Sequence, residues 1–209
     1  MNEDRSASLL SSVVEGLVTR GWVCLDGFLG ETEARELASE SLEAWEGGDF
    51  RRAGVGRGEN LTVREDIRRD HVLWLDPENA GPATRAYLDR LEALRGAINR
   101  ELFLGLFEYE GHFAVYPPGA FYKAHLDRHK GTADRVVTAI LYLNDGWLPE
   151  HGGRLKIWTE AGRQDGPFEH VEPRMGTLVV FLAGDYWHEV EMAHATRMSV
   201  TGWFRVRGA

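Results

Sequence analysis

Hydrophobic positions in the first half of the chain recur at helical spacing in three stretches. Residues 6–20 place apolar side chains on one face, and Gly21 follows where a left-handed cap would end a helix. Residues 34–45 repeat the pattern and end at a pair of glycines, and residues 87–102 show it again. Each predicted helix has one apolar face, so we expect a sheet for the helices to cover.

Two shorter segments between these helices are typical of strands. The sequence WVCLDGFL predicts a strand and a turn, and IRRDHVLWL alternates enough to be a second strand. Residues 48–66 are rich in glycine and arginine and show little periodicity. A loop of this length inside a compact domain is usually functional or disordered.

From Leu106 onward, short runs rich in valine, threonine and aromatic residues alternate with turn signals such as Asn-Asp-Gly. This pattern predicts antiparallel strands, whose edges are hidden when sheets stack or close. We therefore expect an α+β fold, a double-stranded β-helix (jelly roll) backed by N-terminal helices. Residues 1–209 would form one domain, with helical support and the first strands in 1–104 and a jelly-roll catalytic core in 105–209.

Amino-acid composition limits the cellular compartment and the classes of binding partner that we expect. The chain has 209 residues, 43% of them hydrophobic, which suffices for one sizeable core. A net charge of -9 argues against a nucleic-acid-binding surface, although a local basic patch stays open. Cys24 is the only cysteine, which fits a reducing compartment. The sequence shows neither a signal peptide nor a bilayer-spanning run, so we expect a soluble, cytoplasmic protein without membrane partners.

The strand-rich half contains a candidate metal site. His125 and Asp127 are two residues apart, so on a strand both side chains project from one face. His188 lies far along the chain, and two imidazoles with one carboxylate form the facial set that leaves iron(II) three open positions. His194 is the alternative third ligand, although it falls where a turn is expected.

Arg197 lies nine residues after His188, in the predicted strand TRMSVTGWF, and Ser199 faces the same side of that strand. A guanidinium binds a carboxylate through two parallel hydrogen bonds, which a lysine cannot reproduce. We therefore expect Arg197 and Ser199 to bind a distant carboxylate of a ligand. Zinc also fits the metal ligands, so the choice of iron depends chiefly on Arg197.

This order of HxD, distal histidine and arginine resembles the iron(II)- and 2-oxoglutarate-dependent dioxygenase superfamily. The stretches YPPGAFYKAHLD, RVVTAILYLN, HGGRLKIW, WHEV and ATRMSVTGWF look like its prolyl hydroxylase branch, which senses oxygen in animals and has bacterial relatives. IRRDHVLWL extends the resemblance upstream. The resemblance implies iron(II) at the metal site, 2-oxoglutarate and dioxygen as cosubstrates, and ascorbate as a support of activity.

The resemblance also implies roles for individual residues. Tyr116 and Tyr142 would line the 2-oxoglutarate pocket with their hydroxyls, and Trp203 would close its apolar side. Residues 48–66 would form a substrate lid. Asp70 and Arg135 would tie the end of this lid to the barrel.

Two arginines of the lid region, Arg57 and Arg64, are candidates for a grip on the substrate, the alternative being a solvated face. By resemblance, the reaction is hydroxylation of a prolyl residue in a protein, with elongation factor Tu as the candidate partner and succinate and CO2 as products. One alternative is hydroxylation of a free amino acid or another small molecule. Another is a non-catalytic jelly-roll binding module.

Overall fold

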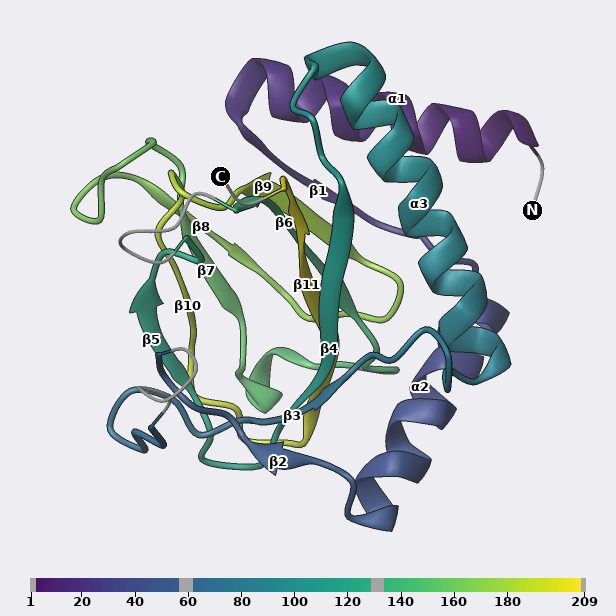
Figure 1. The fold of residues 1–209 in the computed structure, drawn as a ribbon. Helices are drawn as coiled ribbons and strands as arrows, with labels where there is room; N and C mark the ends of the chain where they lie inside the picture. The colour runs from purple at the N-terminus through teal and green to yellow at the C-terminus, as the bar shows by residue number, and fades with distance from the viewer. Residues whose placement is uncertain (1–2, 57–61, 129–133, 208–209) are drawn as a thin grey trace.

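The computed structural model describes residues 3–56, 62–128 and 134–207, which form three α-helices and two β-sheets (Figure 1). The helices are α1 (Glu3–Arg20), α2 (Glu31–Gly47) and α3 (Pro82–Leu102). The strands are β1 (Trp22–Leu25), β2 (Arg51–Arg52), β3 (His71–Trp74), β4 (Glu108–Tyr116), β5 (Tyr122–His125), β6 (Arg135–Tyr142), β7 (Leu155–Trp158), β8 (Phe168–Val171), β9 (Leu178–Leu182), β10 (His188–Val190) and β11 (Arg197–Arg205). A short 3-10 helix, Pro149–His151, precedes β7.

The strands divide into a seven-stranded and a four-stranded antiparallel sheet. The first has the order β1-β9-β6-β11-β4-β3-β2 and the second the order β5-β10-β7-β8. Figure 1 shows the three helices on the outer side of the seven-stranded sheet, with the four-stranded sheet on its other side. This arrangement confirms the expected α+β jelly roll with helical backing.

Strand β11 shows how the large sheet separates a helix-facing core from an inner cavity. Met198, Val200 and Phe204 belong to the hydrophobic cluster beneath the helices. Arg197 and Trp203 alternate with them along the strand and line the cavity on the other face. The period of two residues therefore gives one strand both a packing role and a role in the site.

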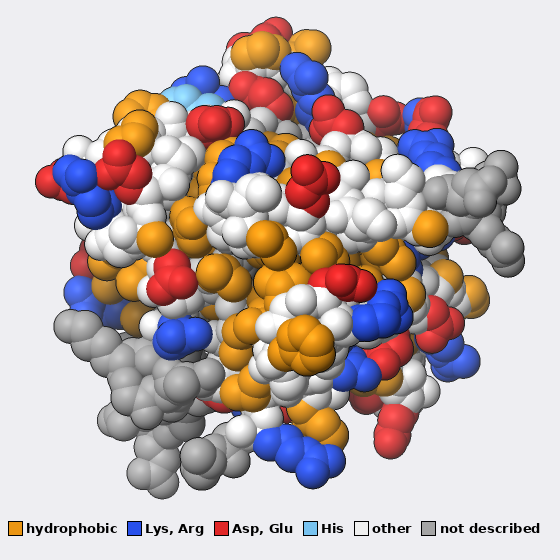
Figure 2. Space-filling view, turned by 90° about the horizontal axis from the view of Figure 1, so that it is seen from above, with side chains coloured by type: hydrophobic (Ala, Val, Ile, Leu, Met, Phe, Trp, Pro, Cys, Tyr) orange, Lys and Arg blue, Asp and Glu red, His pale blue; other side chains and the backbone are white. Residues whose placement is uncertain are grey.

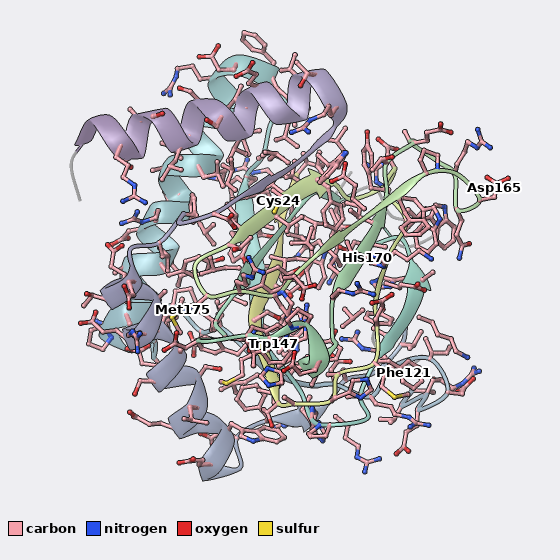
Figure 3. All side chains as sticks on the ribbon, turned by 180° about the vertical axis from the view of Figure 1, so that it is seen from behind. Cys24, Phe121, Trp147, Asp165, His170 and Met175 are labelled. Carbon is pink, nitrogen blue, oxygen red and sulfur yellow. The ribbon has the colours of Figure 1, made fainter. Side chains whose placement is uncertain are left out.

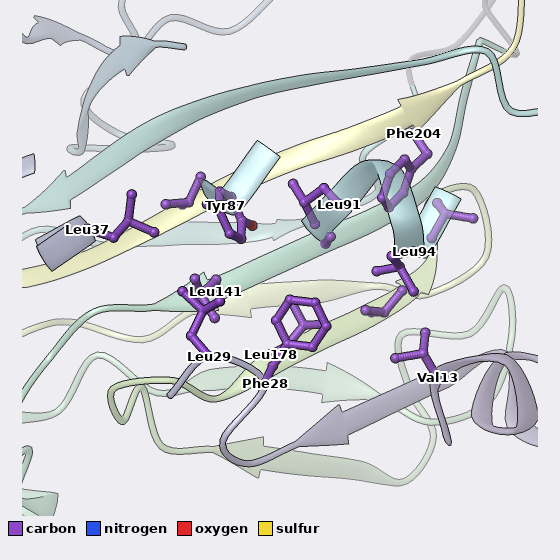
Figure 4. Close-up of a cluster of buried hydrophobic side chains, with 14 of the residues drawn as sticks. Val13, Phe28, Leu29, Leu37, Tyr87, Leu91, Leu94, Leu141, Leu178 and Phe204 are labelled. Atoms are coloured by element: carbon purple, nitrogen blue, oxygen red, sulfur yellow. The ribbon is translucent and has the colours of Figure 1, made fainter. Parts of the chain in front are cut away.

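The cluster beneath the helices holds the large sheet in place. Figure 4 shows side chains of α1, α2 and α3 meeting those of the sheet. The helices contribute Val13, Leu37, Tyr87, Leu91 and Leu94, and the sheet contributes Leu141, Leu178 and Phe204. Burying one such side chain contributes about 1.5–3 kcal/mol, so the sheet is a rigid base for the cavity on its other face.

Specific residues determine where the helices begin and end. Gly21 has a φ of +73°, a left-handed conformation that suits glycine, and its N–H donates to the carbonyl of Leu17 at 3.1 Å. At the start of α3, the carboxylate of Glu40 accepts hydrogen bonds from the backbone N–H groups of Ala83 and Thr84 at 2.8 and 3.0 Å. These bonds satisfy N–H groups that a helix leaves unpaired and join α2 to α3.

Two of the predicted segments differ in detail from the structure. The expected strand IRRDHVLWL is a strand only over His71–Trp74. The expected loop 48–66 contains β2 and an antiparallel bridge between Val55 and Thr62, while residues 57–61 lie outside the described residues. The role of this segment as a lid stays a prediction.

The surface carries some exposed hydrophobic side chains. Val18 and Phe103 are 66% and 86% exposed. The face seen from above in Figure 2 shows hydrophobic side chains between acidic and basic ones. None of the helices in the described ranges combines the length and the hydropathy that a bilayer-spanning helix needs.

Candidate active site

His125 and His188 face each other across neighbouring strands. They are direct partners in the antiparallel pair of β5 and β10, and their ring centroids lie 4.2 Å apart. Asp127 has Oδ1 at 3.4 Å from Nε2 of His125 and Oδ2 at 3.6 Å from Nε2 of His188. The three donor atoms lie within 4.8 Å of one another, and His194 is exposed and outside this group. The structure thus brings together the three residues predicted as metal ligands.

Backbone contacts orient both imidazoles so that Nε2 faces the carboxylate. Nδ1 of His125 lies 2.8 Å from the carbonyl oxygen of Lys123, and Nδ1 of His188 lies 3.1 Å from that of Tyr186. A carbonyl oxygen only accepts, so each Nδ1 carries a proton, and the neutral form of each imidazole has its lone pair on Nε2. Metal-binding histidines are held in this way by their second nitrogen.

The protonation states of the group suit a divalent cation. Burial, reinforced by the neighbouring His125, lowers the pKa of His188 to about 4, so that imidazole is neutral near pH 7. Burial acts to raise the pKa of Asp127, but the two imidazoles and a hydrogen bond from Thr138 outweigh it and hold that pKa well below its usual range. A neutral His188 beside an ionised Asp127 fits the donors that iron(II) requires.

Two further side chains hold the donor set in place. Oγ1 of Thr138, on β6, donates a hydrogen bond of 2.7 Å to Oδ2 of Asp127. The ring of Tyr122 stacks on that of His125, with centroids 3.6 Å apart and an angle of 16° between the planes. Sequence reasoning missed both residues. The sequence held one weak indication for Thr138: it is four residues from Tyr142 on β6, so the two side chains lie on the same face of the strand.

Arg197 is a buried cation with unused hydrogen-bonding capacity. It is 1% exposed, its Nε donates to the carbonyl of Gly153 at 2.8 Å, and its Nη1 lies 3.5 Å from Oγ of Ser199. Nη2 is buried and has no hydrogen-bond partner of normal geometry in the described part of the chain. An unpaired buried N–H of a charged group is costly, so this site fits the carboxylate of a ligand.

Two tyrosines flank the guanidinium of Arg197. The rings of Tyr116 and Tyr142 have centroids 4.8 and 5.0 Å from its Cζ atom. Burial raises the pKa of both hydroxyls above the ordinary tyrosine value, so both keep their protons. Oη of Tyr142 is also buried and, within the described ranges, lacks a hydrogen-bond partner of normal geometry. The hydroxyl is therefore a donor for the same ligand.

One cavity of about 660 Å³ connects the donor set to Arg197. Its walls include the residues Tyr116, His125, Asp127, His188, Arg197 and Trp203. Trp203 stacks on His112, with centroids 5.6 Å apart, and Cζ of Arg135 lies 3.3 Å from the centroid of the Trp203 ring. The cavity therefore joins a metal-binding end, a carboxylate-binding cation and an aromatic wall.

Arg68 is a cavity residue to which the sequence alone gave no separate role. It donates two hydrogen bonds to the carboxylate of Asp70, which is 1% exposed, and its Cζ lies 4.2 Å from the ring centroid of Tyr122. The spacing of two residues between Arg68 and Asp70 is the same signal that identified His125 and Asp127. The available signal was a pair of opposite charges two residues apart in a segment that was expected to be a strand.

The other residues predicted for the lid have different surroundings. Arg135 forms an ion pair with Glu110 at 3.3 Å, and the predicted contact between Asp70 and Arg135 stays a prediction. Arg64 is exposed and pairs with its near neighbour Asp66. The predicted grip residue at position 57, Arg57, lies outside the described residues.

Comparison with known proteins agrees with this geometry. The sequence model of the 2OG-Fe(II) oxygenase superfamily matches residues 111–205, which contain the donor set and Arg197. The crystal structure of a Pseudomonas putida prolyl-4-hydroxylase is 46% identical and covers 94% of this chain and 99% of that one, with a TM-score of 0.86. The chain belongs to the 2OG-Fe(II) oxygenase superfamily.

Two further relatives place this oxygenase in the prolyl hydroxylase branch. A prolyl hydroxylase from Trichoplax adhaerens, solved with a peptide fragment of hypoxia inducible factor, is 25% identical, with a TM-score of 0.84, and covers 97% of this chain and 91% of that one. Human Egl nine homolog 1 is 30% identical over 203 residues, or 93% of this chain and 46% of that protein. The chain spans about half the length of the curated relatives it matches.

Proposed function

We propose that this oxygenase hydroxylates a prolyl residue of a polypeptide while 2-oxoglutarate and dioxygen are converted to succinate and CO2. The observation that carries the proposal is one cavity with a His-Asp-His donor set and the buried, incompletely bonded guanidinium of Arg197. Its relationship to prolyl hydroxylases supports the same reaction.

The donor set, Arg197 and Tyr142 have separate roles in this proposal. His125, Asp127 and His188 would hold iron(II), which, when bound, supplies the activation of dioxygen. Arg197 would bind the far carboxylate of 2-oxoglutarate through its fork of N–H groups. Tyr142 would add a hydrogen bond from its hydroxyl.

Three more side chains complete the cosubstrate pocket. Ser199 would steady the guanidinium through its contact with Nη1. Tyr116 and Trp203, which line the cavity, would enclose the cosubstrate. The cavity walls also include Ile140, Leu155 and Val190, whose apolar side chains exclude water from the reacting atoms.

Elongation factor Tu is the first protein substrate to test, on the resemblance to bacterial prolyl hydroxylases. Ascorbate is included in this proposal as a reductant that sustains activity. The cytoplasmic location and the single-domain organisation expected from the sequence stay predictions.

Mass spectrometry tests the proposal directly. Purified protein would be incubated with iron(II), 2-oxoglutarate and ascorbate, together with elongation factor Tu, a panel of proline-containing peptides and free amino acids. Gain of one oxygen atom on a prolyl residue of a polypeptide, lost in His188→Ala, supports the proposal. Oxygen gained only by a free amino acid identifies a small-molecule hydroxylase. The absence of any product from iron-loaded protein identifies a binding module. Either result contradicts the proposal of prolyl hydroxylation in a polypeptide.

A further inference from the structure

Three exposed cations lie on the chain segments that form the cavity wall beside β2 and β5. Arg51, on β2, lines the cavity itself. Arg69 and Lys123 are not among the cavity walls, but each follows a wall residue, Arg68 or Tyr122, so both lie just outside the cavity. We refer to Arg51, Arg69 and Lys123 as the cationic rim.

The rim is continuous because two chain segments run side by side. The N–H of Arg69 donates to the carbonyl of Phe121 at 3.0 Å, and the N–H of Lys123 donates to that of Ile67 at 2.9 Å. Figure 3 labels Phe121, which belongs to the second of these two segments. The N–H of Ala53, just after β2, donates to the carbonyl of Asp70, the residue after Arg69, at 2.9 Å. The segment around Arg69 therefore links β2 to β5.

Most other charged groups at this entrance are already paired. The ion pairs are Arg52 with Glu65, Arg64 with Asp66, Arg68 with Asp70, and Arg135 with Glu110. In the described ranges, Arg51, Arg69 and Lys123 have no carboxylate at ion-pair distance, and the one side-chain hydrogen bond of Arg69 goes to the carbonyl of Glu65 at 2.9 Å. Asp49 also lines the cavity and forms no ion pair with Arg51. The rim therefore has cationic capacity available for a partner.

We propose that the cationic rim binds an acidic segment of the substrate polypeptide beside the residue that is hydroxylated. The inference rests on the proposed function and names a substrate class for it. The chain as a whole carries a net charge of -9, so three cations beside the cavity without an ion pair in the described ranges are a local site for an acidic partner. Such complementarity accelerates encounter with an acidic partner and selects its register.

The layout of the rim favours an extended polypeptide over a compact anion. Strand β2 is the last strand of its sheet, and β5 is the last strand of the other. Arg51 belongs to the first and Lys123 to the second, with Arg69 on the segment between them. Acidic side chains spaced along a peptide would meet these cations in turn while one residue enters the cavity.

Binding measurements with matched peptides test the rim. Two synthetic peptides each contain one proline, flanked by aspartates in one and by the isosteric asparagines in the other. The variants are Arg51→Glu, Arg69→Glu and Lys123→Glu, and the control is Arg85→Glu. Arg85 is exposed on α3, on the helical side of the large sheet, and is absent from the cavity walls. It therefore matches the charge change without touching the entrance.

Fluorescence anisotropy would give each dissociation constant at low and high salt. The original chain is expected to bind the aspartate peptide about three- to ten-fold more tightly than the asparagine peptide, with a smaller ratio at high salt. Each rim reversal is expected to remove most of that ratio, and Arg85→Glu to keep it. Equal binding of both peptides by the original chain, or an unchanged ratio in all three rim variants, overturns the inference.

Hydroxylation of the same peptides separates this inference from the proposed function. Arg69→Glu and Lys123→Glu, which change residues outside the cavity walls, are expected to hydroxylate the asparagine peptide with unchanged kcat and to show a raised KM for the aspartate peptide alone. If neither peptide nor any other polypeptide is hydroxylated, the proposed function fails, and the binding ratio still decides whether the rim recognises acidic segments.

Discussion

Thr138 and Asp127 are joined by a hydrogen bond of 2.7 Å between two buried side chains, Oγ1 donating to Oδ2. The bond connects β6 of the large sheet to the candidate metal ligand that follows β5 of the small sheet. It therefore fixes the carboxylate relative to His125 and His188. The geometry of the donor set depends on contacts outside the set itself.

Thr138→Val keeps the shape of the side chain and removes this hydrogen bond. We expect metal affinity to fall by about 10- to 100-fold, the usual effect of losing an outer-shell partner. Isothermal titration with manganese(II), with Thr138→Ser as the control that keeps the hydroxyl, measures it. Equal affinity of Thr138→Val and the original chain would show that the carboxylate is held by other contacts.

Arg197→Lys keeps a cation and removes the planar fork. We expect the KM for 2-oxoglutarate to rise by about 10- to 100-fold with metal binding unchanged, because lysine cannot form two parallel hydrogen bonds to a carboxylate. Ser199→Ala, which removes only the 3.5 Å contact with Nη1, should have a smaller effect. Loss of metal affinity in Arg197→Lys, measured by the same titration, would contradict the separate roles.

The pair of Arg68 and Asp70 should matter for stability. Its side chains are 14% and 0% exposed, so Arg68→Ala leaves a buried carboxylate uncompensated. We expect a loss of about 3–5 kcal/mol in the free energy of unfolding, measured by denaturant titration. Arg64→Ala is the matched control because Arg64 forms the same two-bond pair with Asp66 at the same spacing in solvent. A similar loss in both variants would mean that burial is not the cause.

Cys24 should be unreactive in the folded protein. Figure 3 labels it on β1, and burial, followed by the charges of Asp26 and Glu169, raises the pKa of its thiol to about 11. Only the thiolate reacts, so about one thiol in a thousand is reactive at pH 8. We expect slow labelling by a thiol reagent at pH 8 in buffer and fast labelling in denaturant. Fast labelling of the native chain would show an accessible thiol.

The sequence predicted those parts of the site that follow from short spacing. His125 and Asp127 are two apart on an extended segment, and Arg197 and Ser199 alternate on one strand, so the strand period alone places each pair on one face. His188 needed the family resemblance because its contact with His125 depends on the pairing of β5 with β10.

Contacts set by long-range pairing were not predictable in the same way. Thr138 meets Asp127 because β6 and the end of β5 lie in different sheets that face each other. The segment at Arg68 was expected to be part of a regular strand. It instead crosses between the two sheets, forming one isolated bridge with Tyr122 before β3 begins. No local periodicity encodes that crossing.

Succinate formation is the most direct test that the four residues form one oxygenase site. Purified protein with iron(II), ascorbate and 2-oxoglutarate would be compared with His188→Ala, with and without elongation factor Tu. We expect succinate from the original chain, stimulated by a polypeptide substrate, and none above background from His188→Ala. Equal succinate from both proteins, or none from the original chain with iron(II) bound, would contradict the assignment of His125, Asp127, His188 and Arg197 to one oxygenase site.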